Sequence, residues 1–119
     1  MQPVIEAIGD VTIVTLDVKD FDASNADVFR RAIAPVLKDC RKLVLDLERV
    51  QFVDSRGCGT ILSCLKQIAP AGGDLKLCRV NPSVRTVFNL IRMNSICEIL
   101  NTREEAVQAF QNRKQPGGG

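Results

Sequence analysis

Short apolar runs rich in β-branched residues alternate along the chain with segments whose apolar residues recur at helical spacing. The first two runs, residues 4–8 and 11–16, are separated only by Gly9-Asp10. Glycine at the first of two turn positions favours a tight type II′ turn, so the chain is predicted to open with an antiparallel hairpin.

A first helix is predicted over residues 24–38, because Ser24 and Asp27 stand at the spacing of a capping box and apolar residues follow every three or four positions. Pro35 is the weak point of this helix, since an interior proline removes one backbone hydrogen bond and kinks or shortens the last turns. The apolar positions are Phe29, Ala32, Ile33, Val36 and Leu37.

Three more helices alternate with extended segments. Strands are predicted at 42–47 and 75–78, an extended path at 50–53 and an edge strand at 95–100. The second helix is predicted to run from about Cys58 to Ile68. Asn81-Pro82 has the favoured order of cap and first helical residue, and residues 102–105 form another capping box. The third helix is predicted to bury Val84, Val87, Phe88 and Ile91, and the last to bury Ala106, Val107 and Phe110.

This order predicts an α/β fold, in which a mixed β-sheet opens with an antiparallel hairpin and continues with mostly parallel strands. We expect a single domain over residues 1–114 and a disordered, glycine-rich tail over residues 115–119.

Composition narrows the possible chemistry. The chain has 119 residues, a formal charge of +2 and no long basic run. It therefore lacks the concentrated positive charge that binds the phosphate backbone of a nucleic acid. It contains no histidine, which excludes Ser-His-Asp and Cys-His catalysis and the commonest metal ligand. Its 5 cysteines form no C-x-x-C pair and are predicted to be small buried hydrophobes. We therefore expect no metal, no cofactor and no enzymatic activity.

The N-terminal residues lack a basic segment followed by a long apolar core, and no apolar run approaches the ~20 residues that span a bilayer. We expect a cytoplasmic protein without direct membrane insertion.

Candidate functional residues lie in loops that follow strands, where open α/β sheets gather their functional groups. Three loops qualify: residues 21–25, 54–60 and 81–83. The middle loop brings an acid, a hydroxyl and two glycines into the first turn of a helix. Each helical glycine costs about 1 kcal/mol relative to alanine, so two of them indicate that something approaches the backbone closely.

Two roles are open for Ser55. As a helix N-cap, its hydroxyl would accept a hydrogen bond from a free backbone N–H. As an exposed hydroxyl, it would take a phosphate that changes the local charge by about −2 beside free N–H groups and Arg56. Asp54 is likewise either a turn former or an acid that fixes the serine and repels a phosphorylated neighbour.

The segment 44–59 resembles the signature of the STAS domain, as found in bacterial anti-sigma factor antagonists. It reads Val-Leu-Asp-Leu-Glu-Arg-Val-Gln-Phe-Val-Asp-Ser-Arg-Gly-Cys-Gly. The resemblance extends from the opening hairpin to the last helix, and it implies a STAS-like mixed sheet with four to five helices packed mainly on one face.

The resemblance also implies a non-catalytic, partner-switching regulator. Its unphosphorylated form would bind an anti-sigma factor that is also a serine kinase of the histidine-kinase-like ATPase type, and so release a client. Phosphorylation of Ser55 would abolish binding, and a PP2C-type serine phosphatase would restore it. The chain would be a monomer. The implied docking surface comprises Asp22, Ala23, Ser24, Asn25, Asp54, Arg56, Gly57, Cys58, Gly59 and Thr60.

Two positions depart from the family pattern. Arg56 stands where the family usually has Ser or Thr; it would pair with a phosphate on Ser55, contact the kinase, or remain a solvated surface arginine. Cys58 stands where the family usually has a larger aliphatic residue. We expect it to pack, although a thiol near a helix N-terminus can have a lowered pKa.

A different class of function is also open. In this alternative the chain is a non-catalytic STAS accessory subunit of a membrane lipid-transport, ion-transport or signalling assembly, and Ser55 is a helix cap.

Overall fold

The computed structural model describes residues 2–111. The predicted tail over residues 115–119 lies outside this range. The strands are β1 (Val4–Ile8), β2 (Val11–Thr15), β3 (Asp20–Phe21), β4 (Lys42–Asp46), β5 (Phe52–Val53), β6 (Asp74–Cys78) and β7 (Glu98–Leu100). The helices are α1 (Ala26–Leu37), α2 (Ser55–Ile68), α3 (Pro82–Leu90) and α4 (Arg103–Gln111), with 3₁₀ turns η1 (Ala69–Ala71) and η2 (Met93–Ser95).

The main sheet has the strand order β1-β2-β4-β6-β7, with β1 antiparallel to β2 and every other pair parallel. Gly9 adopts a φ of 61°, while Asp10 is not among the residues with positive φ. One positive φ at the first turn position is the type II′ pattern. The predicted hairpin and mixed sheet are therefore confirmed.

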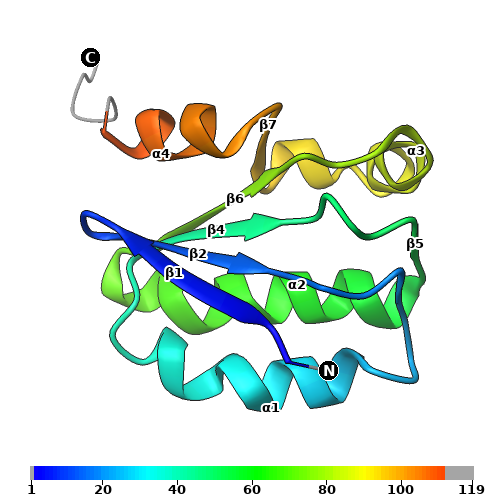
Figure 1. Cartoon of the computed structure of the whole chain (residues 1–119), viewed down its shortest axis with the longest axis horizontal. Helices are drawn as coiled ribbons and strands as arrows, with labels where there is room; N and C mark the ends of the chain where they lie inside the picture. The colour runs from blue at the N-terminus through cyan, green and yellow to red at the C-terminus, as the bar shows by residue number, and fades with distance from the viewer. Residues whose placement is uncertain (1, 112–119) are drawn as a thin grey trace.

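Helices cover both faces of this sheet (Figure 1). Val14, Leu43 and Leu45 belong to the larger core, which includes the buried residues of α1 and α2. Ile13 and Val44, one position along in each strand, belong to the smaller core with Ala106, Val107 and Phe110 of α4. This follows from the twofold alternation of strand side chains, which points successive residues to opposite faces.

A small second sheet, formed by β3 and β5, was not predicted from the sequence. Phe21 pairs in parallel with Val53, and both side chains are buried. Two-residue strands are too short to show an alternating pattern in the sequence. Their pairing brings the loop before α1 against the start of α2.

The predicted caps of α3 and α4 are confirmed, and that of α1 is not. Asn81 accepts a hydrogen bond from the Val84 N–H (3.0 Å), and Thr102 accepts one from the Glu105 N–H (3.0 Å). The predicted capping box of the first helix is wrong: α1 begins at Ala26, and no side chain caps it. The Ser24 hydroxyl instead donates to Asp22 (2.6 Å).

The prediction for the buried face of α3 is half wrong. Val84 and Phe88 are buried, but Val87 is half-buried and Ile91 is 43% exposed. Ile91 also lies just beyond the helix, which ends at Leu90. Part of the apolar stripe of α3 therefore faces outward.

All five cysteines are free and buried, as predicted. Burial raises the pKa of Cys64 and of Cys78 to about 12, and that of Cys97 to about 11. These thiols stay protonated and pack as small hydrophobes.

A buried carboxylate joins three elements at the carboxyl edge of the sheet. Asp46, at the end of β4, is fully buried and receives Nε–H bonds from Arg79 (3.1 Å) and Arg103 (2.7 Å). Burial alone would raise the pKa of Asp46, but the bonds from the two guanidinium groups outweigh it, so its pKa lies below the usual value. Arg103 also pairs with Glu6 of β1 (3.0 Å), which ties α4 to the sheet edge.

Replacing this carboxylate should cost stability in a pH-dependent way. Asp46→Asn is expected to lower the free energy of unfolding near neutral pH by about 3 kcal/mol, because it removes the buried negative charge that Arg79 and Arg103 both contact. A carboxyl whose pKa is lower in the folded chain stabilises above its unfolded pKa of about 4, and that contribution is lost as the pH falls through the lowered value.

Urea unfolding of both proteins across this acid range measures the effect. The difference between them should shrink as the pH falls below about 4. A difference that stays constant with pH would contradict the assigned role of the Asp46 charge.

Candidate functional site

The first turn of α2 is held by Asp54, which is its N-cap residue. The Asp54 side chain accepts a hydrogen bond from the Gly57 N–H (2.9 Å) through Oδ1. This bond, reinforced by one from the Ala23 N–H, holds the pKa of Asp54 below its usual value. The carboxylate is therefore ionised at neutral pH, and its charge lies at the positive end of the helix dipole.

The same carboxylate connects the two predicted docking segments. Its second oxygen, Oδ2, accepts a hydrogen bond from the Ala23 N–H (3.1 Å), 31 positions earlier in the chain. The loop around Ala23 is shaped by its own bonds, since the Asp22 N–H donates to Asn25 (3.0 Å) and the Ser24 N–H donates to Asp22 (3.0 Å). The structure thus brings residues 22–25 beside residues 54–60.

Ser55 is the first residue of α2 and is exposed. The cap bond is made by Asp54, so the alternative in which Ser55 caps the helix is wrong. The Ser55 hydroxyl lies at the surface, where a modifying enzyme could reach it.

The two glycines of this turn have different surroundings. A Cβ on Gly57 would meet the carbonyl oxygen of Phe21 and lie 2.9 Å from Cγ1 of Val53. Gly57 is therefore required by the close approach of β3 and β5 to α2. Gly59 is exposed, and a Cβ there would meet nothing within 4 Å.

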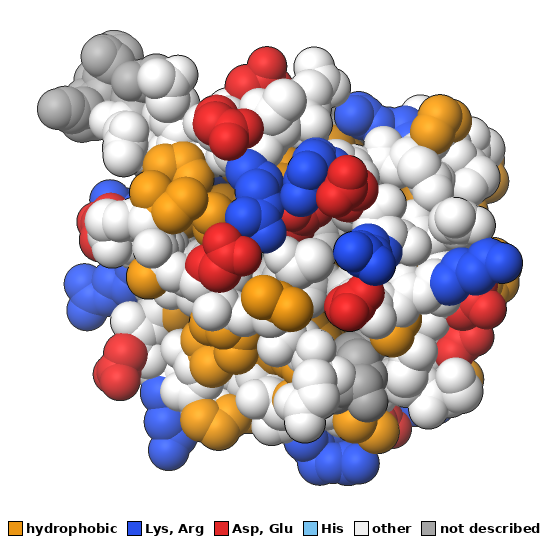
Figure 2. Space-filling model, viewed as in Figure 1, with side chains coloured by type: hydrophobic (Ala, Val, Ile, Leu, Met, Phe, Trp, Pro, Cys, Tyr) orange, Lys and Arg blue, Asp and Glu red, His pale blue; other side chains and the backbone are white. Residues whose placement is uncertain are grey.

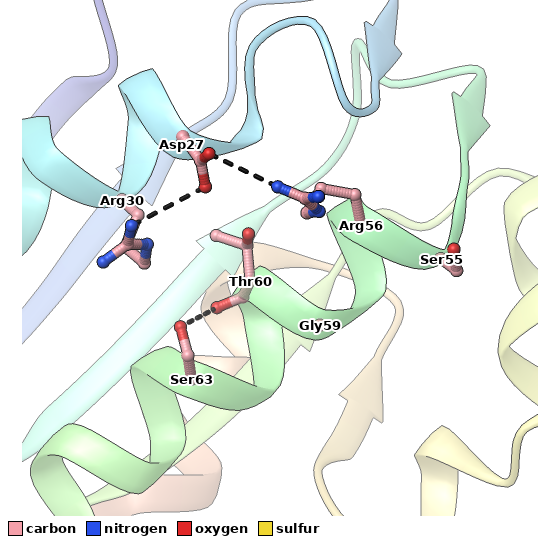
Figure 3. Close-up of a pocket in the computed structure, with 7 residues that line it drawn as sticks. All are labelled: Asp27, Arg30, Ser55, Arg56, Gly59, Thr60 and Ser63. Atoms are coloured by element: carbon pink, nitrogen blue, oxygen red, sulfur yellow. Dashed lines mark hydrogen bonds and ion pairs between the residues drawn. The ribbon is translucent and has the colours of Figure 1, made fainter.

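A polar groove of about 470 Å³ lies between α1 and α2 on one side of Ser55 (Figure 3). In it, Arg56 reaches toward α1 and pairs with Asp27 (3.3 Å), which also pairs with Arg30 (3.6 Å). This surface ion pair was not among the three roles predicted for Arg56 from the sequence. The groove is lined by Asp27, Arg30, Ser55, Arg56, Gly59, Thr60 and Ser63.

An apolar groove of about 580 Å³ lies on the other side of Ser55, between β5, α2 and α3. Sequence reasoning missed the residues that make it apolar, because helical periodicity assigned Val87 and Ile91 to the core. Phe52 is 50% exposed in this groove. The lining residues are Phe52, Val53, Asp54, Ser55, Cys58, Gly59, Leu62, Val87 and Ile91.

Cys58 is buried, and its pKa is raised, first by burial and then by the nearby Asp54 charge. The alternative of a lowered thiol pKa at this helix N-terminus is therefore wrong. Cys58 acts as a packing residue beneath the apolar groove.

Neither a cluster of metal ligands nor a helix that could span a membrane occurs among the side chains and helices that the structure describes. Within residues 2–111, no three His, Cys, Asp or Glu side chains cluster as metal ligands would. Over the same range, no helix is both long and apolar enough to span a bilayer. Positive and negative side chains are intermingled on the face drawn in Figure 2, without an extended area of one sign.

Sequence comparisons identify relatives along most of the chain. The model of the STAS domain matches residues 2–106. The chain is 36% identical to BtrV of Bordetella bronchiseptica, provisionally named an anti-sigma factor antagonist, over 76% of this chain and 78% of that protein. It is 32% identical to the anti-sigma F factor antagonist of Paenibacillus polymyxa, over 77% of this chain and 80% of the relative.

Solved structures agree with this fold. A crystal structure from Thermotoga maritima, provisionally described as an anti-sigma factor antagonist, matches with a TM-score of 0.85 at 28% identity, covering 92% of this chain and 94% of that chain. The anti-sigma factor antagonist SpoIIAA in its unphosphorylated form matches with a TM-score of 0.78 at 21% identity, covering 92% and 96%. The Bacillus SpoIIAA has also been solved in a phosphorylated form, with a TM-score of 0.69 at 21% identity over 91% of this chain and 98% of that chain.

Substitution by alanine should change the free energy of unfolding in opposite directions at Gly57 and Gly59. Gly57→Ala is expected to lower the free energy of unfolding by about 1–3 kcal/mol, because its Cβ would overlap the Phe21 carbonyl and force β3 or α2 to move. Gly59→Ala is expected to raise it by up to about 1 kcal/mol, because the helix gains a better helix former in open space. Urea denaturation of the two variants measures both values, and equal destabilisation would contradict the distinction.

Proposed function

Since this chain belongs to the STAS-domain family, we propose that it is an anti-sigma factor antagonist that switches partners through phosphorylation of Ser55. Unphosphorylated, it binds an anti-sigma factor that is also a serine kinase of the histidine-kinase-like ATPase type. Binding releases the client of that factor, and phosphorylation ends the complex. The relatives named as anti-sigma factor antagonists support the general role.

One observation carries the assignment of Ser55. Ser55 is exposed and directly follows Asp54, whose carboxylate joins both docking segments by accepting from Ala23 on one side and Gly57 on the other. A phosphate on Ser55 would place about two negative charges beside that carboxylate. It would also compete with Asp54 for the N–H groups of the helix start.

The proposed phosphate therefore acts in two ways. It changes the charge of the docking surface directly, and it weakens the Asp54 bond that holds residues 22–25 in place. A phosphate on Ser55 would compete with Asp27 for the Arg56 guanidinium group, because Arg56 and Asp27 are paired in the unmodified protein.

The kinase reaction needs no catalytic group from this chain. The Ser55 oxygen attacks the γ-phosphorus of ATP bound to the kinase, ADP leaves, and the hydroxyl proton passes to a base of the kinase. A PP2C-type serine phosphatase would hydrolyse phosphorylated Ser55 to serine and inorganic phosphate, and so restore binding. We propose that the cycle runs in the cytoplasm with this chain as a monomer.

The proposal is tested with the serine-kinase anti-sigma factors of the organism that encodes this chain, each purified and titrated against the protein by calorimetry. Ser55→Asp is expected to weaken binding about 100-fold, which corresponds to about 2.7 kcal/mol. Ser55→Ala should bind within about threefold of wild type, and it should unfold within about 0.5 kcal/mol of wild type because Ser55 does not cap the helix. Incubation with ATP should add one phosphate to wild type and none to Ser55→Ala by intact mass.

Gln108→Glu is the matched control for charge, because it adds one negative charge at an exposed position of α4, which packs on the opposite face of the sheet. It should bind like wild type. Equal binding by Ser55→Asp and wild type would refute the switch. A stable membrane-associated partner retained by wild type, Ser55→Ala and Ser55→Asp alike would favour the accessory-subunit alternative.

A further inference from the structure

No close contact within the described structure explains why position 59 of α2 is a glycine. Nothing lies within 4 Å of the Cβ position of Gly59, and the residue is exposed. A glycine inside a helix weakens it, so a position with free space would ordinarily be better filled by alanine. A bare backbone at the surface is useful where a second molecule approaches the helix closely.

Gly59 and Ser55 each line both grooves, so the apolar groove continues directly from the proposed phosphorylation site. Its walls carry apolar side chains from three elements, and Phe52 and Ile91 are 50% and 43% exposed. Leu62 and Val87 are half-buried between them. An apolar hollow beside a polar groove is typical of the buried centre and polar rim of a protein interface.

The elements that line the groove favour a helix as its occupant. Two of the three are the helices α2 and α3, and the apolar ridge of a third helix packs readily against the grooves between the side chains of other helices. Pairing with an added strand is disfavoured, because β5 has only two residues.

The position of Ser55 indicates that the occupant is apolar. A phosphate at this end of the groove would face the inserted side chains, and burying such a charge without a partner is costly. An apolar occupant would therefore be expelled by phosphorylation, as the proposed switch requires.

We propose that the anti-sigma factor inserts the apolar side of an amphipathic helix into the groove formed by Phe52, Leu62, Val87 and Ile91, crossing α2 over Gly59. This inference rests on the proposed function and extends its docking surface to β5 and α3, beyond residues 22–25 and 54–60.

Two neighbouring residues provide a matched test. Ile91 lines the groove, whereas Leu90, at 80% exposure, does not. In titrations with the purified cognate anti-sigma factor, Ile91→Ser should weaken binding about tenfold, and Leu90→Ser should change it less than about twofold. Both side chains are exposed, so both variants should fold.

Gly59→Ala supplies an independent readout. It should weaken binding about tenfold although it makes the chain more stable, a combination that a purely structural role for the glycine does not produce. Methyl resonances of Leu62, Val87 and Ile91 should shift on addition of the anti-sigma factor, while those of Leu90 should not.

The outcomes separate this inference from the proposed function. If Ser55→Asp abolishes binding while Ile91→Ser and Gly59→Ala bind like wild type, the groove is not the docking site and the switch stands. A dimer of this chain that dissociates on Ile91→Ser would instead assign the groove to a second copy and overturn the inference. If wild type binds none of the purified anti-sigma factors, both proposals fall.

Discussion

The carboxylate of Asp54 is the interaction on which the geometry of the site depends. Its two oxygens accept hydrogen bonds from Ala23, in the loop that follows β3, and from Gly57, in the first turn of α2. Each backbone bond contributes about 1 kcal/mol or more, because the acceptor is charged. The pairing of β3 with β5 supplies the frame, since Phe21 and Val53 hold the two loops at the distance that one carboxylate can bridge. The surface between α1 and α2 is therefore a single unit rather than two independent loops.

A second carboxylate, Asp46, performs a different task at the same edge of the sheet. It is fully buried and compensated by Arg79 and Arg103, so its charge holds β4, the turn after β6 and the start of α4 together. Arg79 adopts a φ of 56°, a left-handed conformation that non-glycine residues adopt only when their surroundings enforce it. The buried charge stiffens the frame, whereas the solvated charge at Asp54 joins the loop before α1 to the first turn of α2 at the surface.

The sequence predicts those features that have local physical causes. The Gly9-Asp10 turn, the Asn81 cap and the sidedness of α4 follow from backbone preference and periodicity, and they were predicted correctly. The β3–β5 pairing and the link from Asp54 to Ala23 depend on residues about 31 positions apart, which no local pattern records. Periodicity also overstated the burial of Ile91: it shows which side of a helix is apolar, but not whether another element covers that side. Ser55 and Gly59 belong to a short local motif and were therefore found from the sequence. The groove beside them is formed by β5 and α2 together with α3, which lies further along the chain, and it was not found.

The magnitudes support the proposed switch, in which a charge at Ser55 governs an interface built on apolar contacts. Burying one large aliphatic side chain contributes about 1.5–3 kcal/mol, so two or three inserted residues account for much of a micromolar affinity, about 8 kcal/mol. A phosphate at the end of the same groove would lose part of its hydration when the partner docks, and the effective cost for a poorly paired ion is several kcal/mol. Arg56 can offset little of that cost, since it is exposed and already shares Asp27 with Arg30. The desolvation cost of the phosphate and the free energy gained by burying the inserted side chains are thus of similar size. Under that condition, a single phosphoryl group can shift the partner from the bound to the free state.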